Sequence, residues 1–443
     1  MSYRGVPESN RLYARAQELI PGGTQLFSRR AERFVPGLAP MYLARAEGVR
    51  VWDVDGNEWV DFGMGCGPVI LGHCHPAVNA AVTAQVQKGN CFTVNDPLEI
   101  DLAELIIELV PGAEMVRFFK TGGETNAAAI RIARGVTGRD KVAFCGYHGW
   151  HDWYLAANLG DPSTLDTHLL PGLDTRGVPR ALAGTALPFE YNNLASLRAV
   201  LEANRGEIAC VIMEACRSKT PEPGFLAGVR DLAHEHGALL IFDEIVTGFR
   251  LALGGAQEFF GVTPDLCTFA KALANGYPLG AVCGRREVMR EAATMFISST
   301  YFSDSIGLAA GLATLRILRD EPVIPHLWGL GQELRERLEG IVTRYALPFH
   351  CHGYPPALHV GFDHPDERTR VLLTTVFLQE MLRDGVLCLM GLYLSHAHRV
   401  EHLERYLRAA ERGLATAAEG LERGDLEDRL VAGLWGSHFR RQV

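Results

Sequence analysis

The sequence predicts an α/β protein with a large, mostly parallel-sheet domain and a smaller α+β domain built from the N- and C-terminal parts of the chain. Apolar runs alternate with amphipathic stretches between residues 76 and 320, which is typical of a parallel sheet covered by helices on both faces. Beyond residue 320 the pattern changes to long charged helical segments with short strands between them. The length of 443 residues also exceeds that of one typical domain.

Residues 1–75 are expected to form an N-terminal segment of the smaller domain, with a helix followed by short strands. The stretch VRVWDVDGNEWVDF contains two β-rich runs that flank Asp55-Gly56, a pair of residues that favours a tight hairpin turn.

Residues 76–320 are expected to form the large domain. Its predicted strands are EMVRFFK, KVAFCGY, CVIMEA, ALLIFDEI, DLCTFAKA and GAVCG, and GFLAGVRDLAHEHG is one of the predicted helices between them. Residues 321–443 complete the smaller domain, with helices in HLWGLGQELRERLEGIVTRY and AHRVEHLERYLRAAERGLATAAEGLE and strands in PALHVGFD and GVLCLMG.

Composition narrows the class of partner. The net charge is −9, from 43 basic and 52 acidic residues without long runs of either sign, so neither nucleic acid nor an anionic membrane is expected as a partner. No apolar run is long enough to span a bilayer, and the N-terminus lacks the apolar stretch of a signal peptide. We therefore expect a cytoplasmic protein that acts on small molecules. Most of its ten cysteines, which form no CxxC pair, are expected to be reduced core thiols.

Two residues at predicted strand ends indicate the chemistry. Asp243 ends the apolar run of LLIFDEIVTGFR, and Lys271 ends that of DLCTFAKALANGYPLG. A carboxylate that pairs with a protonated pyridine nitrogen and an amine that forms a Schiff base are what a pyridoxal 5′-phosphate enzyme needs. Ile245 is expected to pack on a face of the cofactor ring. The alternative for the acid is a structural ion pair with Arg250.

A second pattern suits a phosphate. The segment FFKTGGETNAAAIRIARGVTGR is expected to run from a strand through a turn at Thr121, Gly122 and Gly123 into a helix, where unpaired amides can hold an anion. The alternative is that the glycines only form a tight turn. In CGYHGWHDWY, Tyr147 is placed to stack on a planar ring, or else to lie at a rim or interface.

Clustered histidines also suggest a metal, as in His148 and His151 with Asp152, His73-Cys74-His75 and His350-Cys351-His352. No HExxH pattern or paired CxxC spacing accompanies them, so no metal site is predicted. Arg217 and Lys219 are candidates for binding a carboxylate or phosphate of a substrate, or are solvated side chains.

Together these segments resemble the class III aminotransferases, most closely their glutamate-1-semialdehyde aminomutase-like branch. The resemblance spans nearly the whole chain and rests on IPGG, DVDGNEWVDF, LGHCHPAV, TGGETNAAAIRIARGVTGR, GYHG, LLIFDEIVTGFR, PDLCTFAKALANGYPLGAVCGRREVM, AAGLATL and SHAH. It implies a fold-type I pyridoxal 5′-phosphate enzyme that forms a homodimer with active sites shared between subunits.

The resemblance also implies roles for individual residues. Lys271 would be the Schiff-base lysine and Asp243 the partner of the pyridine nitrogen, with Ile245 and Tyr147 on the two ring faces. The remaining cofactor-binding candidates are Thr121, Gly122 and Gly123 for the phosphate, Thr300 for the phosphate of the neighbouring subunit, Glu214 as the acid of the family's Glu-Pro segment, and His148 in the GYHG motif.

The predicted reaction is transfer of an amino group from an amine donor, an amino acid, to a small carbonyl acceptor such as a keto sugar, a semialdehyde or an oxo acid. The phosphate loop reads TGGE where the family commonly has SGTE, Ala215 follows Glu214 where the family has proline, and YFSDSIGLA replaces the usual glycine-asparagine-proline segment. These departures argue against semialdehyde isomerisation. The alternatives are an aminomutase or epimerase with the same cofactor, and a noncatalytic binding protein on the same fold.

Overall fold

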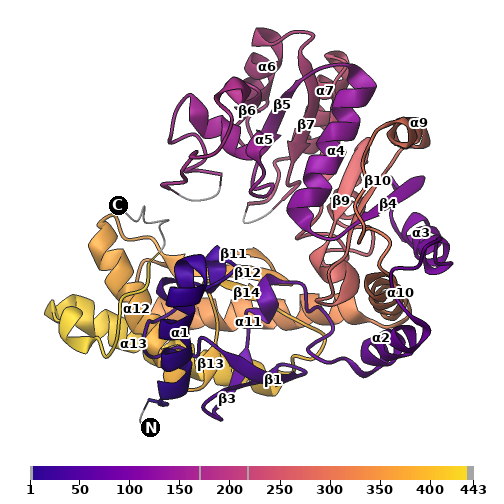
Figure 1. The fold of residues 1–443 in the computed structure, drawn as a ribbon. Helices are drawn as coiled ribbons and strands as arrows, with labels where there is room; N and C mark the ends of the chain where they lie inside the picture. Colours follow the sequence, from indigo (N-terminus) through magenta and orange to yellow (C-terminus); the bar gives the residue numbers. More distant parts are fainter. Residues whose placement is uncertain (1–2, 169–170, 217–218, 437–443) are drawn as a thin grey trace. The chain divides into compact units, whose positions relative to one another are not determined.

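The computed structural model describes residues 3–168, 171–216 and 219–436. These residues form two compact units, one made of Met1–His75 together with Pro325–Ser437 and the other of Pro76–Ile324 (Figure 1). Each unit combines helices with β-sheet, and the α/β class predicted from the sequence is confirmed.

The unit Pro76–Ile324 is built around a seven-stranded sheet with the strand order β4-β10-β9-β8-β7-β5-β6 (Figure 1). Its strands are β4 (Met115–Phe119), β5 (Lys141–Cys145), β6 (Ala186–Pro188), β7 (Ile208–Met213), β8 (Leu239–Asp243), β9 (Leu266–Phe269) and β10 (Gly280–Gly284). Strands β6, β5, β7, β8 and β9 are parallel to their neighbours. Strand β10 is antiparallel to both β4 and β9, so β4 runs in the same direction as the other parallel strands.

The strands form because their residues are apolar on both faces. All six residues of β7, Ile208–Met213, are buried, as are all four of β9, which is expected of a sheet covered on both sides. The helices of this unit are α2 (Pro76–Lys88), α3 (Leu98–Leu109), α4 (Gly122–Thr137), α5 (Asp152–Leu155), α6 (Leu194–Ala203), α7 (Phe225–Glu235), α8 (Ala256–Phe260), α9 (Arg286–Glu291) and α10 (Ser305–Asp320). Helix α4 packs across β7, β8, β9 and β10, so it lies directly over the centre of the sheet.

The other unit contains two small sheets. Strands β1 (Leu43–Glu47), β2 (Arg50–Asp53) and β3 (Glu58–Asp61) form an antiparallel sheet that β13 (Val386–Leu387) joins in parallel, and β11 (Phe349–Tyr354), β12 (Ala357–Phe362) and β14 (Gly391–Tyr393) form the second. Its helices are α1 (Pro7–Leu19), α11 (Val323–Tyr345), α12 (Glu367–Arg383) and α13 (Val400–Arg423). The pairing of β2 with β3 confirms the hairpin predicted around Asp55-Gly56.

Two further predictions concern the cysteines and the absence of membrane-spanning segments. All ten cysteines are free thiols, and six of them are buried, so the prediction of mostly reduced core cysteines is confirmed. Within the described ranges, no helix combines the length and the apolar character that crossing a bilayer requires.

Candidate active site

The predicted site residues follow the carboxyl ends of strands that point the same way. Thr121 follows β4, Tyr147 follows β5, Glu214 follows β7, Asp243 ends β8 and Lys271 follows β9. In register, Asp243 lies opposite Thr268 of β9, and Lys271 comes three residues after that threonine. Open α/β sheets bind ligands at this edge, so the fold brings the predicted residues to the expected place.

Asp243 is buried, with 4% of its surface exposed, and its carboxylate is held by a network of donors. Its Oδ2 accepts a hydrogen bond from Asn126 Nδ2 at 2.7 Å and faces His148 Nδ1 at 2.8 Å, and its Oδ1 accepts from the backbone N–H of Ile245 at 3.0 Å. His148 Nε2 lies 3.2 Å from the carbonyl oxygen of Cys145. Both ring nitrogens of His148 therefore face oxygen atoms, which fixes the orientation of the ring beside Asp243.

Asn126 connects this carboxylate to the neighbouring strand. Its side-chain amide also donates to the carbonyl of His148 at 3.2 Å, and its Oδ1 accepts from the Thr268 hydroxyl at 2.7 Å. Asn126 and Thr268 are almost completely buried, so their polar atoms depend on these bonds. Neither residue was among the sequence-predicted site residues. The available signal was a polar residue inside an apolar segment, Asn126 in TNAAAIRIA and Thr268 in LCTF.

The hydrogen bonds around Asp243 leave room for a cationic ligand. A carboxylate oxygen has two lone-pair positions, and among the described residues Oδ2 uses two while Oδ1 uses one. The remaining acceptor position belongs to a buried carboxyl group at a ligand-binding edge. A protonated pyridine nitrogen fits this position, because its N–H would complete the set of donors.

The adjacent acid, Glu244, has a different role. Its carboxylate accepts hydrogen bonds from the backbone N–H groups of Ala256 at 2.8 Å and Gln257 at 2.9 Å, and from the Thr247 hydroxyl. Burial raises the pKa of the Glu244 carboxyl, although these hydrogen bonds oppose the shift. Of the two acids at this strand end, Asp243 lies in the network with Asn126 and His148, and Glu244 holds the first turn of α8.

The phosphate-loop prediction needs one correction. Gly122 and Gly123 were expected in a turn, but α4 begins at Gly122, with Thr121 as the residue that precedes its first turn. A Cβ on Gly122 would lie 2.8 Å from Ile245 Cδ1. Glycine is needed at position 122 because the Ile245 side chain lies against it, and this contact also fixes where the isoleucine sits beside the loop.

A buried nitrogen faces the same loop. A Cβ on Gly123 would lie 3.1 Å from His151 Nδ1, and this nitrogen is buried without a hydrogen-bond partner among the described residues. Burial lowers the pKa of the His151 ring, while the charges of Glu124 and Asp152 oppose that shift. The start of a 16-residue helix together with an unpartnered ring nitrogen fits a phosphate group.

Tyr147 and Glu214 are tied to each other through the backbone. Glu214 is buried, and its Oε2 accepts a hydrogen bond from the backbone N–H of Tyr147 at 3.0 Å. The Tyr147 ring is 36% exposed and contacts Tyr154 edge to face, with ring centroids 5.9 Å apart. Cys145, at the end of the same strand, is not an available nucleophile, because burial raises the pKa of its thiol to about 12.

Lys271 occupies an uncommon backbone conformation. Its φ is +46°, in the left-handed region that non-glycine residues enter at a cost of about 1–2 kcal/mol. It begins a short 3₁₀ turn, Lys271–Ala274, directly after β9. Strained positions of this kind are found preferentially at functional sites.

An ion pair that the sequence analysis did not predict lies beside Thr121, the residue before α4. Lys120 Nζ is 2.7 Å from Asp304 Oδ2, and both side chains are largely buried. The same aspartate caps α10 by accepting from the backbone N–H groups of Ile306 and Gly307. Burial acts to raise the pKa of Asp304, but its hydrogen bond and charge interaction with Lys120 hold that pKa below its usual value.

Two of the remaining predicted residues are exposed in the structure, namely Thr300 and Lys219. Arg217, the other predicted cation for substrate binding, lies outside the described residues.

The chain is similar in sequence to proteins of a known family. The family model for class-III aminotransferases matches residues 35–392. A 3-aminobutyryl-CoA aminotransferase from Cloacimonas acidaminovorans is 36% identical over 420 residues, which cover 93% of this chain and 97% of that protein. A glutamate-1-semialdehyde 2,1-aminomutase from Syntrophobacter fumaroxidans is 39% identical over 429 residues, covering 91% and 96%.

Among solved structures, the pyridoxal-phosphate internal aldimine form of the FumI protein from Sphingopyxis sp. MTA144 superposes with a TM-score of 0.84. It shares 27% sequence identity and covers 94% of this chain and 97% of that chain. This similarity extends over both compact units.

The chain therefore belongs to the class-III aminotransferase family. It is an enzyme of the pyridoxal-phosphate-dependent aminotransferase type with a fold-type I architecture, and the family, fold, enzyme class and cofactor predicted from the sequence are confirmed. Within the family, its sequence is similar both to an aminotransferase and to an aminomutase.

Proposed function

We propose that this enzyme transfers an amino group from an amino-acid donor to a separate small carbonyl acceptor. The observation that carries the proposal is the buried Asp243 carboxylate with one unused acceptor position, on the strand next to the one that leads into Lys271. Bound pyridoxal phosphate supplies an electron sink for the carbanion that forms when a proton leaves the donor's Cα. The protein must hold the ring, its phosphate and the moving proton.

Asp243 keeps the proton on the pyridine nitrogen. Because Asn126 and His148 both contact its Oδ2 and the backbone N–H of Ile245 donates to its Oδ1, the carboxylate is held in one orientation. The fixed position of Oδ1 stabilises the negative charge that develops during proton removal, since the group does not have to reorient as the reaction proceeds.

Lys271 would hold the cofactor through its Nζ, and the released amine would then accept and return the proton that leaves the donor's Cα. The left-handed backbone at Lys271 sets the direction in which its side chain leaves the strand end. Thr121, Gly122, Gly123 and the first amides of α4 hold the phosphate, so the cofactor stays in place when the lysine releases it. Ile245 and Tyr147 would contact the two faces of the ring, and Glu214 fixes the backbone at Tyr147.

A homodimer with shared active sites is part of this proposal. The support is the resemblance of the SSTYFSD segment to a family segment that reaches the neighbouring subunit's phosphate, together with the exposure of Thr300. We also propose a cytoplasmic location, where free amino-acid donors are present. Sedimentation of the cofactor-loaded enzyme tests the dimer, and a T300A variant is expected to bind the cofactor more weakly while its sedimentation is unchanged.

The acceptor proposed is a keto sugar, a semialdehyde or an oxo acid. A second candidate function is amino transfer within one molecule, and the similarity to the Syntrophobacter aminomutase favours it. The two reactions differ in one product, because transfer from a separate donor releases an oxo compound derived from that donor.

A half-reaction assay distinguishes these functions. The cofactor-loaded enzyme is mixed with a panel of amino acids and amines without an acceptor, and the visible absorbance of the cofactor is followed while oxo products are identified by mass spectrometry. We expect at least one donor to yield one oxo product per active site, with none from the K271A variant. Release of no oxo compound by any donor, with isomerisation of an amino semialdehyde, would establish the second candidate.

A further inference from the structure

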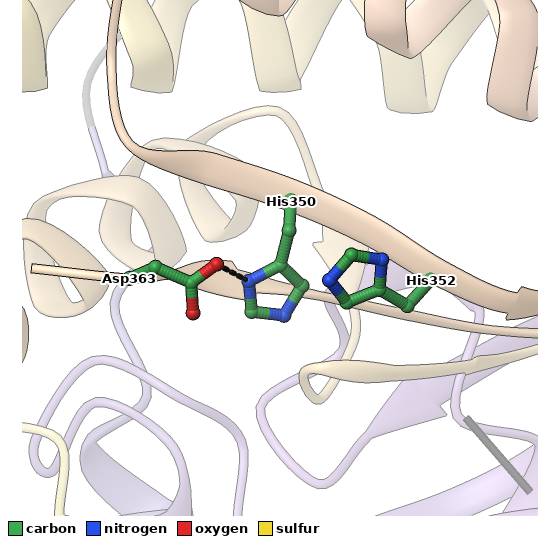
Figure 2. A group of neighbouring side chains, drawn as sticks. All are labelled: His350, His352 and Asp363. Carbon is green, nitrogen blue, oxygen red and sulfur yellow. Dashed lines mark hydrogen bonds and ion pairs between the residues drawn. The ribbon is translucent and has the colours of Figure 1, made fainter. Parts of the chain in front are cut away.

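Histidine and aspartate side chains, which are of the types that bind metal ions, gather on one face of the hairpin formed by β11 and β12. This hairpin belongs to the unit made of the N- and C-terminal parts of the chain, and the proposed aminotransferase site residues all belong to the other unit. In register, His352 lies opposite His359 and His350 lies opposite Gly361. Side chains at every second position of a strand share a face, so the register places His350 and His352 on the same side of the hairpin as His359. Asp363, just beyond the strand, lies beside the two histidines His350 and His352 (Figure 2).

Three of these side chains converge. His350 Nδ1 is 2.8 Å from Asp363 Oδ2, and the rings of His350 and His352 stack with centroids 4.4 Å apart and planes 7° from parallel (Figure 2). One ligand atom from each of His350, His352 and Asp363 lies within 4.8 Å of the others. Gly361 makes room for this arrangement, because a Cβ there would lie 2.9 Å from Cε1 of His350.

We propose that His350, His352 and Asp363 bind a divalent transition-metal ion such as zinc. Zinc takes histidine nitrogen and carboxylate oxygen at about 2.0–2.2 Å, which places ligand atoms roughly 3.3–3.5 Å apart in a tetrahedral site. The exposed side chains of His352 and Asp363 reach that spacing by rotating about their side-chain bonds. The cation takes the place of the proton between His350 Nδ1 and Asp363.

The residues around His350, His352 and Asp363 are compatible with metal binding. His350 Nε2 lies 3.4 Å from His359 Nδ1, and a partner on the second nitrogen is what orients metal-binding histidines. Cys351 lies between the two histidines in sequence and alternates to the opposite face of the strand, so it is not part of this group of ligands. Two imidazoles and one carboxylate favour zinc, cobalt, nickel or copper over magnesium or calcium.

The proposal departs from the sequence-based expectation of no metal site. That expectation considered the spacing of His350, Cys351 and His352 along the chain. It did not include Asp363, which joins the histidines only through the pairing of the two strands.

The test uses the full-length, cofactor-loaded enzyme without a purification tag, washed with a chelator and freed of excess cofactor by gel filtration. Calorimetric titration with zinc chloride measures stoichiometry and affinity, and cobalt chloride reports the donor atoms through its visible absorption. We expect one ion per chain and a cobalt spectrum without thiolate bands. H352A and D363N are each expected to weaken zinc binding at least about tenfold.

H364A is the matched control, since it removes a neighbouring histidine whose Nδ1 accepts from the backbone of Asp366 and which is not part of the group. Its zinc affinity should equal that of the unchanged enzyme. Thermal unfolding of the metal-free variants checks that each is folded. Absence of stoichiometric binding, an affinity that H352A and D363N leave unchanged, or cobalt–thiolate bands would overturn the proposal.

Discussion

Replacement of Asn126 tests whether the network around Asp243 fixes the cofactor. In N126A the Asp243 carboxylate loses a 2.7 Å hydrogen bond, and the Thr268 hydroxyl loses its acceptor. A hydrogen bond to a charged group contributes about 1.5–3 kcal/mol. Since about 1.4 kcal/mol corresponds to a factor of ten in an equilibrium constant, we expect N126A to bind pyridoxal phosphate roughly 10- to 100-fold more weakly.

Two further substitutions are expected to lower cofactor affinity by less and by more than N126A. T268V keeps the shape of the side chain but leaves Asn126 Oδ1 without its donor, so we expect a loss of about 1 kcal/mol, or roughly fivefold, in cofactor affinity. N126D places a second carboxylate against Asp243 Oδ2, and one of the two must then hold a proton. N126D should therefore lose more affinity and turnover than N126A.

The assay is titration of the cofactor-free enzyme with pyridoxal phosphate, followed by absorbance, with thermal unfolding of each cofactor-free variant. N158A is the matched control, because Asn158 is another buried asparagine of the same unit, and its side-chain partners among the described residues are backbone groups of Leu165 and Leu173. It should lower stability by a similar amount and leave cofactor affinity unchanged. If N126A bound the cofactor within twofold of the unchanged enzyme, or N158A weakened binding equally, the assigned role of Asn126 would be refuted.

Three other predictions follow from the site. K271A should lose turnover and the visible absorbance of the bound cofactor, and turnover near the wild-type rate would exclude the lysine's role. G122A should weaken cofactor binding about tenfold, because the new Cβ meets Ile245 Cδ1 and overpacking of this kind costs about 1–3 kcal/mol. I245V removes that atom, so the double variant G122A/I245V should regain most of the affinity. If it does not, the loss in G122A has another cause than this steric contact. D304N should lower the melting temperature by about 2–6 °C at pH 7, from about 1–2 kcal/mol for a largely buried ion pair. Lys120 holds the pKa of Asp304 in the folded protein below its ordinary value of 3.8, so the ion pair stabilises the protein above pH 3.8 and ceases to do so as the pH falls through the folded-state pKa. If the difference in melting temperature between D304N and wild type did not shrink over this pH range, the stabilising role of the ion pair would be contradicted.

The strand-end residues could be predicted because their signal is local. An apolar run followed directly by a polar residue marks the end of a buried strand, and the carboxyl ends of parallel strands share an edge. Asp243, Lys271 and Thr121 were found in this way, and the strands that precede them are present in the structure.

Other features depend on contacts between distant segments. Asn126 meets Asp243 and Thr268 across 117 and 142 residues, and no pattern within α4 reveals those partners. The partners of Glu244 also lie further along the chain, since its carboxylate accepts from the backbone N–H of Ala256 across 12 residues, so its structural role could not be predicted from LLIFDEIVTGFR. The need for glycine at position 122 likewise arises from Ile245, a residue of a different strand end.

These long-range contacts explain why α4 is central to the site. Its first turn offers the amides that suit a phosphate, and Asn126, one turn further, holds the carboxylate that suits the ring nitrogen. With a rise of 1.5 Å per residue, Gly122 and Asn126 are separated by about 6 Å along one rigid helix. Through Thr268 the same asparagine is also bonded to β9, the strand that leads into Lys271. In the proposed binding mode a single helix sets the spacing between the groups that hold the two ends of the cofactor and links both to the lysine, so a shift of α4 along its axis would disturb phosphate binding and the Asp243 carboxylate together.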